Sequence, residues 1–428
     1  MSRQSVGCFV LALVVLCLMG LLVYQIPPVN QRLSWRVEQM QASIRYAINP
    51  PQKDVFKPVG QTLPKEADKL PTATVTAVPT ATPTVPGPTP SPVPTATSTF
   101  TPTPLPPQTL LNGFVHEFQL MNNCGPANLA MSLSFWGWQG NQRDAAAVLK
   151  PNQQDKNVMP YEMVDFVNEH TDFRALARVG GDIEMIKAFI AAGFPVIVEK
   201  GFDFPAYGWM GHYEVVHGYD DVAQTFFVQD SFKQDGPYVE VSYEDLVSQW
   251  RAFNNTYIVT YPPEREDEVF SILGAQVDAN TNYQAALQKA SKESASLTGR
   301  DQYFSFFNRG ANLVALHDYQ NAATAYDAAF ANYANIPEDQ RPWRILWYQT
   351  GPYFAYFFTG RYQDVIDLAN ETLSNTRLVE ESYYWRGMAE LALGNNQAAI
   401  ADFMHSLKVH PSFIPAVEQL NALGVAAK

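Results

Sequence analysis

A stretch dominated by proline and threonine, between residues 71 and 108, limits this chain's folding more than any other feature. Proline removes backbone donors and fixes φ, and threonine adds no buried apolar bulk, so the stretch cannot form a core. Its composition predicts an extended, semi-rigid stalk of polyproline character. At about 3 Å per residue such a stalk reaches roughly 100 Å. The chain is therefore expected to fold separately on either side of it.

On the N-terminal side, residues 6–24 carry no charge and are rich in Leu, Val, Met and Cys. A helix of that length, at about 1.5 Å per residue, spans roughly 28 Å, close to the apolar thickness of a bilayer. The run ends at Tyr24 and is followed by Pro27-Pro28, with no small-residue cleavage signal. It therefore predicts an uncleaved transmembrane signal anchor within residues 1–28.

The charges that flank this run do not decide its orientation, because arginines lie on both sides, Arg3 before it and Arg32 and Arg36 after it. The stalk suggests the answer, since a spacer of that kind is typical of wall-spanning or glycosylated segments outside the membrane. We expect a single-pass membrane protein with its globular part extracytoplasmic, on the cell surface. Residues 29–109 are then a weakly ordered juxtamembrane region and the stalk.

The composition excludes several classes of function. A net charge of −13, with 42 acidic against 29 basic residues and no Lys/Arg-rich stripe, argues against a nucleic-acid partner. No His, Cys and carboxylate cluster has the spacing of metal ligands, and no glycine-rich phosphate loop occurs, so no metal or cofactor is expected. The length is sufficient for two or three domains with cores of their own.

Cys124 is the only cysteine after the first 20 residues, and Gly125-Pro126 follow it. Residues 128–138 have apolar side chains at helical spacing, and proline is tolerated in a first helical turn, so Cys124 is predicted at a helix N-terminus. There the helix dipole favours thiolate over thiol. This is the physical requirement for a nucleophilic cysteine.

Further elements follow along residues 110–265. Helical patterns cover 161–170 and 182–192, and strand patterns then occupy 193–199, 211–220, 225–231 and 257–261. Helices first and an antiparallel sheet afterwards indicate an α+β domain.

This pattern resembles papain-like cysteine peptidases, specifically the bacteriocin-leader-processing, C39-like type found among exported bacterial proteins. The resemblance spans about residues 110–262 and rests on Gln119, the segment 123–127, the strand 212–221, and Val228-Gln229-Asp230. It implies a catalytic triad of Cys124, His212 and Asp230, with Gln119 in the oxyanion hole. The histidine would pair with the thiolate and protonate the leaving amine, and the aspartate would orient the imidazole.

Four features leave alternatives open. His217 lies five residues after His212 in the same strand, and only one of them can face Cys124; the resemblance favours His212. In many relatives the glutamine lies one residue further upstream than Gln119 does here. A cysteine at a helix start is by itself more often a small core residue, and Asp230 could be a turn residue.

From about residue 280 to 428 the sequence is helical and repetitive. Segment 310–329 aligns without gaps with 387–406, and both begin with glycine and have an aromatic, Tyr326 or Phe403, sixteen positions later. Gly360 and the residues after it precede the similar segment that begins at Gly394 by 34 residues. A 34-residue period of paired helices resembles tetratricopeptide (TPR) repeats. The middle repeat is degenerate, with Gly351-Pro352 in its first helix. The array is expected either to bind a peptide or protein partner or only to pack on the preceding domain.

The sequence thus predicts a membrane-anchored, extracytoplasmic cysteine peptidase that hydrolyses a peptide bond, with an all-α TPR solenoid binding its peptide or protein substrate or another protein. Two alternatives remain. One is a catalytically inactive scaffold or peptide-binding protein with the peptidase fold, and the other is an acyl transferase that forms the same thioester.

Overall fold

The structure, a computed structural model, describes residues 104–150, 152, 155, 157–204, 208–232 and 237–426. A few isolated positions before them are also described, of which Phe56, Lys57 and Pro58 are consecutive. The predicted stalk before residue 104 and most of the candidate membrane helix and of the juxtamembrane region lie outside the described residues. None of the helices in the described part is long and apolar enough to cross a bilayer.

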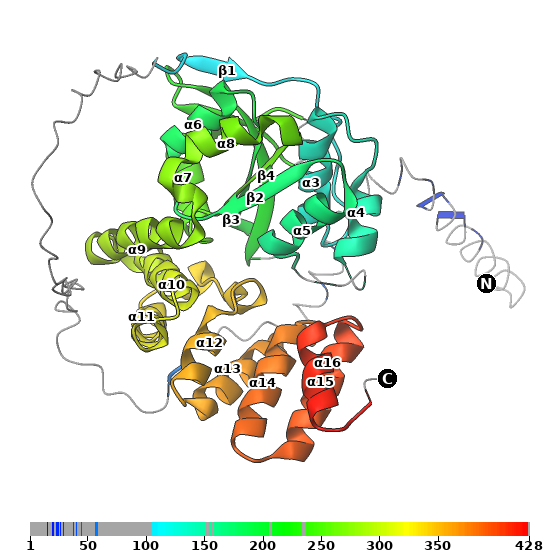
Figure 1. The fold of residues 1–428 in the computed structure, drawn as a ribbon, viewed down its shortest axis with the longest axis vertical. Coiled ribbons are helices and arrows are strands. Elements are labelled where there is room, and N and C mark those ends of the chain that lie inside the picture. The colour runs from blue at the N-terminus through cyan, green and yellow to red at the C-terminus, as the bar shows by residue number, and fades with distance from the viewer. Residues whose placement is uncertain are drawn as a thin grey trace, which may run out of the picture.

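A seven-stranded sheet forms the centre of the first folded unit (Figure 1). Its strands follow the order β2-β7-β3-β4-β5-β6, β1 pairs with β4, and every pairing is antiparallel. The strands are β1 Gln108–Leu110, β2 Arg174–Arg178, β3 Val196–Phe204, β4 Gly208–Asp220, β5 Thr225–Gln229, β6 Val239–Ser242 and β7 Tyr257–Tyr261.

Six helices cover the two faces of this sheet, which makes the unit an α+β domain. The side chains of α3, α4 and α5 share one core with Ile197, Tyr213 and Val215. Those of α6, α7 and α8 share a second core with Val196 and Val216, which point to the opposite face as strand alternation requires. The helices are α3 Cys124–Phe135, α4 Gln142–Leu149, α5 Pro160–His170, α6 Ile183–Ala191, α7 Tyr243–Arg251 and α8 Glu266–Leu273.

The chain order differs in one respect from helices followed by a sheet. Strand β2 lies between α5 and α6 in sequence, yet it pairs with β7 at the edge of the sheet, Ala175 opposite Thr260. The segment Arg174–Arg178 reads Arg-Ala-Leu-Ala-Arg and has no β-branched or aromatic residue, so it has a weak strand signal on its own. Its pairing partner, more than 75 residues away, is what makes it a strand.

The C-terminal region is helical and consists of hairpins that stack side by side (Figure 1). Two of them have the same construction. A Cβ on Gly310 would come 2.6 Å from the ring of Tyr326, and a Cβ on Gly387 would come 2.8 Å from Phe403, so only glycine lets each aromatic ring approach so closely. The helices are α9 Ala279–Ser296, α10 Gly299–Ala315, α11 Tyr319–Tyr333, α12 Gly351–Phe358, α13 Tyr362–Asn375, α14 Glu380–Ala392, α15 Asn396–Val409 and α16 Ile414–Ala422.

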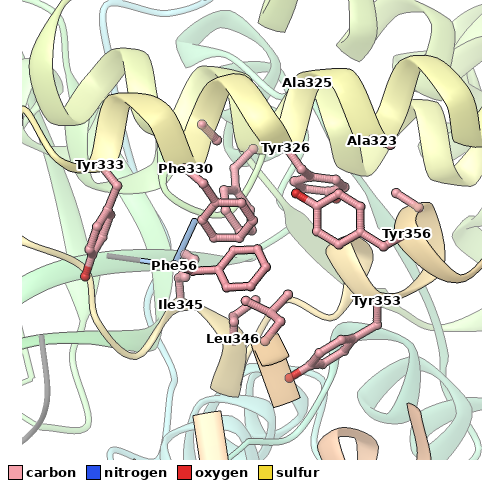
Figure 2. Packing of buried hydrophobic residues seen from close by; sticks show 14 of the residues in the cluster. Phe56, Ala323, Ala325, Tyr326, Phe330, Tyr333, Ile345, Leu346, Tyr353 and Tyr356 are labelled. Atoms are coloured by element: carbon pink, nitrogen blue, oxygen red, sulfur yellow. The ribbon is translucent and has the colours of Figure 1, made fainter. Parts of the chain in front are cut away.

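Between α11 and α13 the chain departs from the repeated pattern of paired helices. Gly351 and Pro352 begin α12 rather than interrupt a helix, and proline is favoured in the first turn because its missing N–H has no partner there anyway. Before α12 come two short 3₁₀ turns, Glu338–Gln340 and Ile345–Trp347. The helical region packs around the aromatic core shown in Figure 2.

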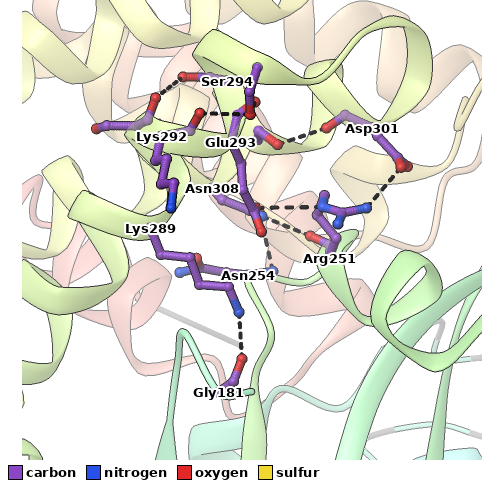
Figure 3. Close-up of polar contacts among 12 residues, drawn as sticks. Gly181, Arg251, Asn254, Lys289, Lys292, Glu293, Ser294, Asp301 and Asn308 are labelled. Atoms are coloured by element: carbon purple, nitrogen blue, oxygen red, sulfur yellow. Dashed lines mark hydrogen bonds and ion pairs between the residues drawn. The ribbon is translucent and has the colours of Figure 1, made fainter. Parts of the chain in front are cut away.

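A buried polar seam joins the first unit to α9 and α10 (Figure 3). Arg251, at the end of α7, forms ion pairs with Asp301 at 2.8 Å and with Glu293 at 3.5 Å. Asn254 lies within hydrogen-bond distance of Asn308 and Asn312. Because Arg251 and the three asparagines are buried, separating the two units would leave these polar groups without their partners.

Candidate active site

Cys124 is the first residue of α3, and its thiol is free and only partly exposed. The residue before it, Asn123, makes no side-chain cap, so the first amides of the helix keep their donors for other partners. A helix N-terminus carries about half a positive charge, which favours an anion at the cysteine. The local sequence therefore places a thiol where thiolate is the preferred form.

His212 and Asp230 lie next to this thiol on neighbouring strands. His212 belongs to β4, Asp230 directly follows β5, and Nε2 of the imidazole is 2.8 Å from Oδ1 of the carboxylate. Both residues are only 2% exposed. The other ring nitrogen of His212, Nδ1, is buried and has no hydrogen-bond partner, so it is the nitrogen available to the Cys124 thiol.

Electrostatics couples these three groups. Burial would raise the pKa of the Cys124 thiol, but the interaction with His212 and the backbone amides of Tyr213 and Gly125 lowers it below the usual value. Burial would likewise lower the pKa of His212, yet the charge and hydrogen bond of Asp230, together with Cys124, raise it to about 9. At neutral pH the arrangement favours a thiolate beside an imidazolium.

Asp230 is held in its ionised form from two sides. Burial alone would raise its pKa, but His212 and Lys200 keep it well below the usual range. Lys200 is the register partner of His212 on β3, and it forms a buried ion pair with Glu214, with Nζ 2.6 Å from Oε2. A second charged pair, Lys200 and Glu214, therefore lies beside Asp230, and its lysine helps to keep that carboxylate ionised.

Aromatic rings cover the imidazole. Phe202 lies 5.6 Å and Phe232 6.0 Å from the ring of His212, and the two phenylalanines are 6.2 Å apart. Rings in these positions keep water from the His212–Asp230 hydrogen bond. In a water-poor environment a charged hydrogen bond is stronger than in solution.

Gln119 is oriented by the residue that follows Asp230. The hydroxyl of Ser231 donates to Gln119 Oε1 at 2.9 Å, and the backbone amide of Gln119 donates to the Ser231 carbonyl at 2.8 Å. With its oxygen engaged, the Gln119 side chain retains its Nε2 group as a donor. That is the atom an oxyanion hole would use.

Two buried amides hold the loop and helix that carry these groups. Asn128 Nδ2 lies 2.9 Å from the Cys124 carbonyl and 2.9 Å from Ser231 Oγ. Gln142 Oε1 accepts from the backbone of Leu120 and from the side chain of Asn123, both at 2.8 Å. The loop before Cys124 is thus tied to α3 and α4 rather than left to its own conformation.

His217 belongs to a separate environment. A β-bulge between Val216 and Gly218 interrupts the alternation of β4 at this position. His217 Nδ1 lies 2.9 Å from the Leu111 carbonyl, and its Nε2 is 3.4 Å from Gln229 Nε2. His116, on the other side of Gln229, is 2.7 Å from Gln229 Oε1. Burial keeps the pKa of His116 below the usual value and outweighs the charge of Asp230, which acts to raise it. In the described part of the chain, no carboxylate is among the groups that act on the pKa of His217.

Several residues that support the site were not expected from the sequence: Asn128, Gln142, Ser231, and the pair Lys200 and Glu214. A signal existed for some of them. Asn128 is a polar residue that opens a mostly apolar helical pattern, and Lys200 and Glu214 are charges near the apolar runs 196–198 and 215–216. Gln142 has no comparable signal. Among the residues that the structure describes, no group of three His, Cys, Asp or Glu side chains is placed to hold a metal ion.

Residues 109–258 match the model of the Peptidase_C39 like family. The match covers the sheet and α3 to α7, including Cys124, His212 and Asp230, and it supports a C39-like peptidase domain followed by a helical region.

Individual proteins are more distant. Aryl-hydrocarbon-interacting protein-like 1 of Pan paniscus is 23% identical over 168 residues, which cover 36% of this chain and 42% of that protein. The Mus musculus protein of the same name is 24% identical over 166 residues, which cover 36% of this chain and 48% of that protein. The chain spans less than half the length of these curated relatives.

Two solved structures are similar at low identity. A C39-like peptidase from Bacillus anthracis is 18% identical, with a TM-score of 0.29, and the match covers 36% of this chain and 96% of that one. The peptidase domain of Streptococcus ComA, a bifunctional ABC transporter involved in quorum sensing, is 19% identical, with a TM-score of 0.28. That match covers 35% of this chain and 98% of the other.

Proposed function

We propose that this protein is a cysteine peptidase that cleaves a peptide bond through a thioester on Cys124. The observation that carries the proposal is the buried His212–Asp230 hydrogen bond of 2.8 Å beside a thiol whose pKa is lowered. The Cys124 thiolate attacks the carbonyl carbon, and imidazolium His212 donates a proton to the leaving amine. Water, deprotonated by the neutral imidazole, then attacks the thioester and regenerates the thiol.

The oxyanion of each tetrahedral intermediate needs donors. In the proposal these are Gln119 Nε2 and the backbone amide of Cys124, which begins α3. One such donor contributes on the order of 3 kcal/mol in comparable sites. Ser231 supports this role indirectly, because it occupies the Gln119 oxygen and so fixes which end of the amide is free.

We further propose that the protein is held to a membrane by residues 6–24, with the globular part outside the cytoplasm, and that the helical region binds its substrate or a protein partner. The uncharged N-terminal run and the proline- and threonine-rich stretch support the first proposal. The stacked helical hairpins with a repeated glycine–aromatic contact support the second.

The test is cleavage of a proteome-derived peptide library by the full chain, with new N-termini identified by mass spectrometry. Wild-type protein and the His217→Ala variant should give the same products, and Cys124→Ala should give none. Repeating the reaction with glycinamide as an added nucleophile separates a hydrolase from an acyl transferase, because a transferase would place the amine on the new C-terminus. Identical digests from wild type and Cys124→Ala would contradict the peptidase proposal and favour a scaffold.

A further inference from the structure

Phe56 lies far from the helical region in sequence, yet its side chain is buried within that region's core. It is 7% exposed and belongs to the same cluster as residues of α10, α11 and α12. Its ring lies 5.0 Å from Phe330 in an edge-to-face arrangement and 6.3 Å from Tyr356. Figure 2 shows Phe56 between α11 and the turn that carries Ile345 and Leu346.

The walls of this socket are fixed by contacts that do not involve Phe56. Tyr356 donates its hydroxyl to Asp327 at 2.9 Å, and the guanidinium of Arg361 stacks over the Tyr356 ring at 4.1 Å. Arg361 also forms hydrogen bonds with both carboxylate oxygens of Asp327, at 2.8 and 2.9 Å. On the opposite wall, Phe330 packs on Phe307 with 5.8 Å between ring centroids. A socket held this way is organised before an aromatic ring enters it.

The residues next to Phe56 differ from it sharply. Lys57 is exposed and Pro58 is partly buried, and none of the three forms part of a helix or strand. One apolar side chain is therefore inserted from an irregular segment, while its charged neighbour stays in water. This is how an extended segment docks a single anchor residue into a pocket, rather than how a core element packs along its length.

We propose that the aromatic core between α11 and α12 is a docking site for an aromatic side chain on an extended segment, and that the chain's own Phe56-Lys57-Pro58 segment occupies it. The connection between Pro58 and residue 104 then starts on the helical region and ends at β1 on the first unit. An extended chain of that length reaches well over 100 Å, so it links the two points without strain. An anchor before residue 56 would be attached at the helical region, and the length of the proline- and threonine-rich stretch would not separate it from the folded body.

This proposal does not depend on catalysis, and its test is a binding measurement. The probe is a fluorescein-labelled peptide of residues 50–64, used against the full chain and the variants Phe56→Ala and Lys57→Ala. In wild type the tethered segment competes at an effective concentration on the order of millimolar, so the socket is already filled. The Phe56→Ala chain should therefore bind the peptide at least about tenfold more tightly than wild type or Lys57→Ala. The same peptide with Phe56→Ala should bind none of the three.

Equal binding by the three chains, or no binding by a folded Phe56→Ala chain, would overturn the proposal. If Phe56→Ala does not fold, Phe56→Leu serves in its place, since it keeps an apolar anchor but weakens the fit. Hydrogen exchange gives a second readout. Amides of α11 and α12 should exchange faster in the alanine or leucine variant and recover when the peptide is added. A concentration-dependent dimer in light scattering would instead show that the segment comes from a second copy, which would contradict docking within one chain.

Discussion

Strand β4, Gly208–Asp220, buries two histidines five residues apart, and their surroundings have opposite effects on their pKa values. His212 is 2% exposed and His217 is fully buried, so desolvation disfavours the charged form at both. Asp230 and Cys124 reverse this at His212 and raise its pKa to about 9. At His217 the partners are a carbonyl and an amide, and burial keeps its pKa below the usual value.

Both histidines are buried, so it is the charged partners of His212 that give the two side chains pKa values on opposite sides of the usual one. Lys200 and Glu214 extend the charged environment around His212. At His217, Gln229 offers only a neutral amide, and burial and the charge of nearby His116 both lower the pKa of His217. Each of the four predictions below changes a group at or near one of these two histidines and is compared with its own reference variant.

The largest effect is expected from the buried pair beside His212. Lys200→Met would leave Glu214, whose side chain is fully buried, without its counter-ion, and we expect a loss of about 3–5 kcal/mol in unfolding free energy. The double variant Lys200→Met/Glu214→Leu removes both charges and should lose much less. Urea denaturation of the single and double variants measures this. An equal loss in both would mean that packing, and not charge, is what the pair provides.

The second effect concerns the counter-ion of His212. Asp230→Asn should lower the His212 pKa from about 9 and reduce the reactivity of Cys124 at pH 7 by about 100-fold, since the thiolate loses its cation. With the raised pKa, the stability from protonated His212 is complete below about pH 6.5 and lost as the pH rises through about 9. Histidine NMR titration measures the shift. The Gln229→Ala variant should leave the His212 titration unchanged, and a shift of the same size there would contradict the comparison.

A smaller effect is expected from the hydroxyl that orients Gln119. Ser231→Ala removes a buried partner of both Gln119 and Asn128, and we expect a loss of about 1–3 kcal/mol in unfolding free energy. An exposed serine, Ser296, hydrogen-bonds only within its own helix and provides the control. Ser296→Ala should change the unfolding free energy by less than about 0.5 kcal/mol. Equal losses would argue against a special position for Ser231.

The smallest effect is expected at His217. Because the pKa of His217 is lowered in the folded state, the unfolded chain binds more protons near pH 6, and stability falls as the pH drops through about 6.5. Replacing this residue, His217→Gln, should flatten that decline between pH 7 and pH 5. Thermal melts at the two pH values compare the variant with wild type. A steeper decline in the variant would show that the sign assigned to His217 is wrong.

Much of the first unit could be predicted from periodicity and local chemistry. The helix at Cys124, the strand that begins near His212 and the last strand Tyr257–Tyr261 occur close to where the sequence patterns placed them. The antiparallel sheet and the helical C-terminal region also agree with expectation.

The features that could not be predicted from the sequence depend on contacts between residues far apart in the chain. Strand β2 depends on β7, the bulge at His217 depends on its pairing with β5, and Gln142 acts through a loop more than 20 residues before it. The burial of Phe56 was also not expected, because its neighbours in sequence read as a weakly ordered region. Local patterns do not encode contacts of this kind.

We propose that His212, and not His217, is the histidine that stabilises a Cys124 thiolate. The direct test is alkylation of Cys124 by iodoacetamide in the full chain from pH 4 to pH 9, with Cys8 and Cys17 replaced by serine, for wild type, His212→Ala and His217→Ala. An ordinary thiol is about 0.3% ionised at pH 6. The account predicts that wild type and His217→Ala react at pH 6 on the order of 30-fold or more faster than His212→Ala, even though a low-pKa thiolate is a weaker nucleophile. Reaction of all three only above pH 8, or a loss caused by His217→Ala instead, would contradict it.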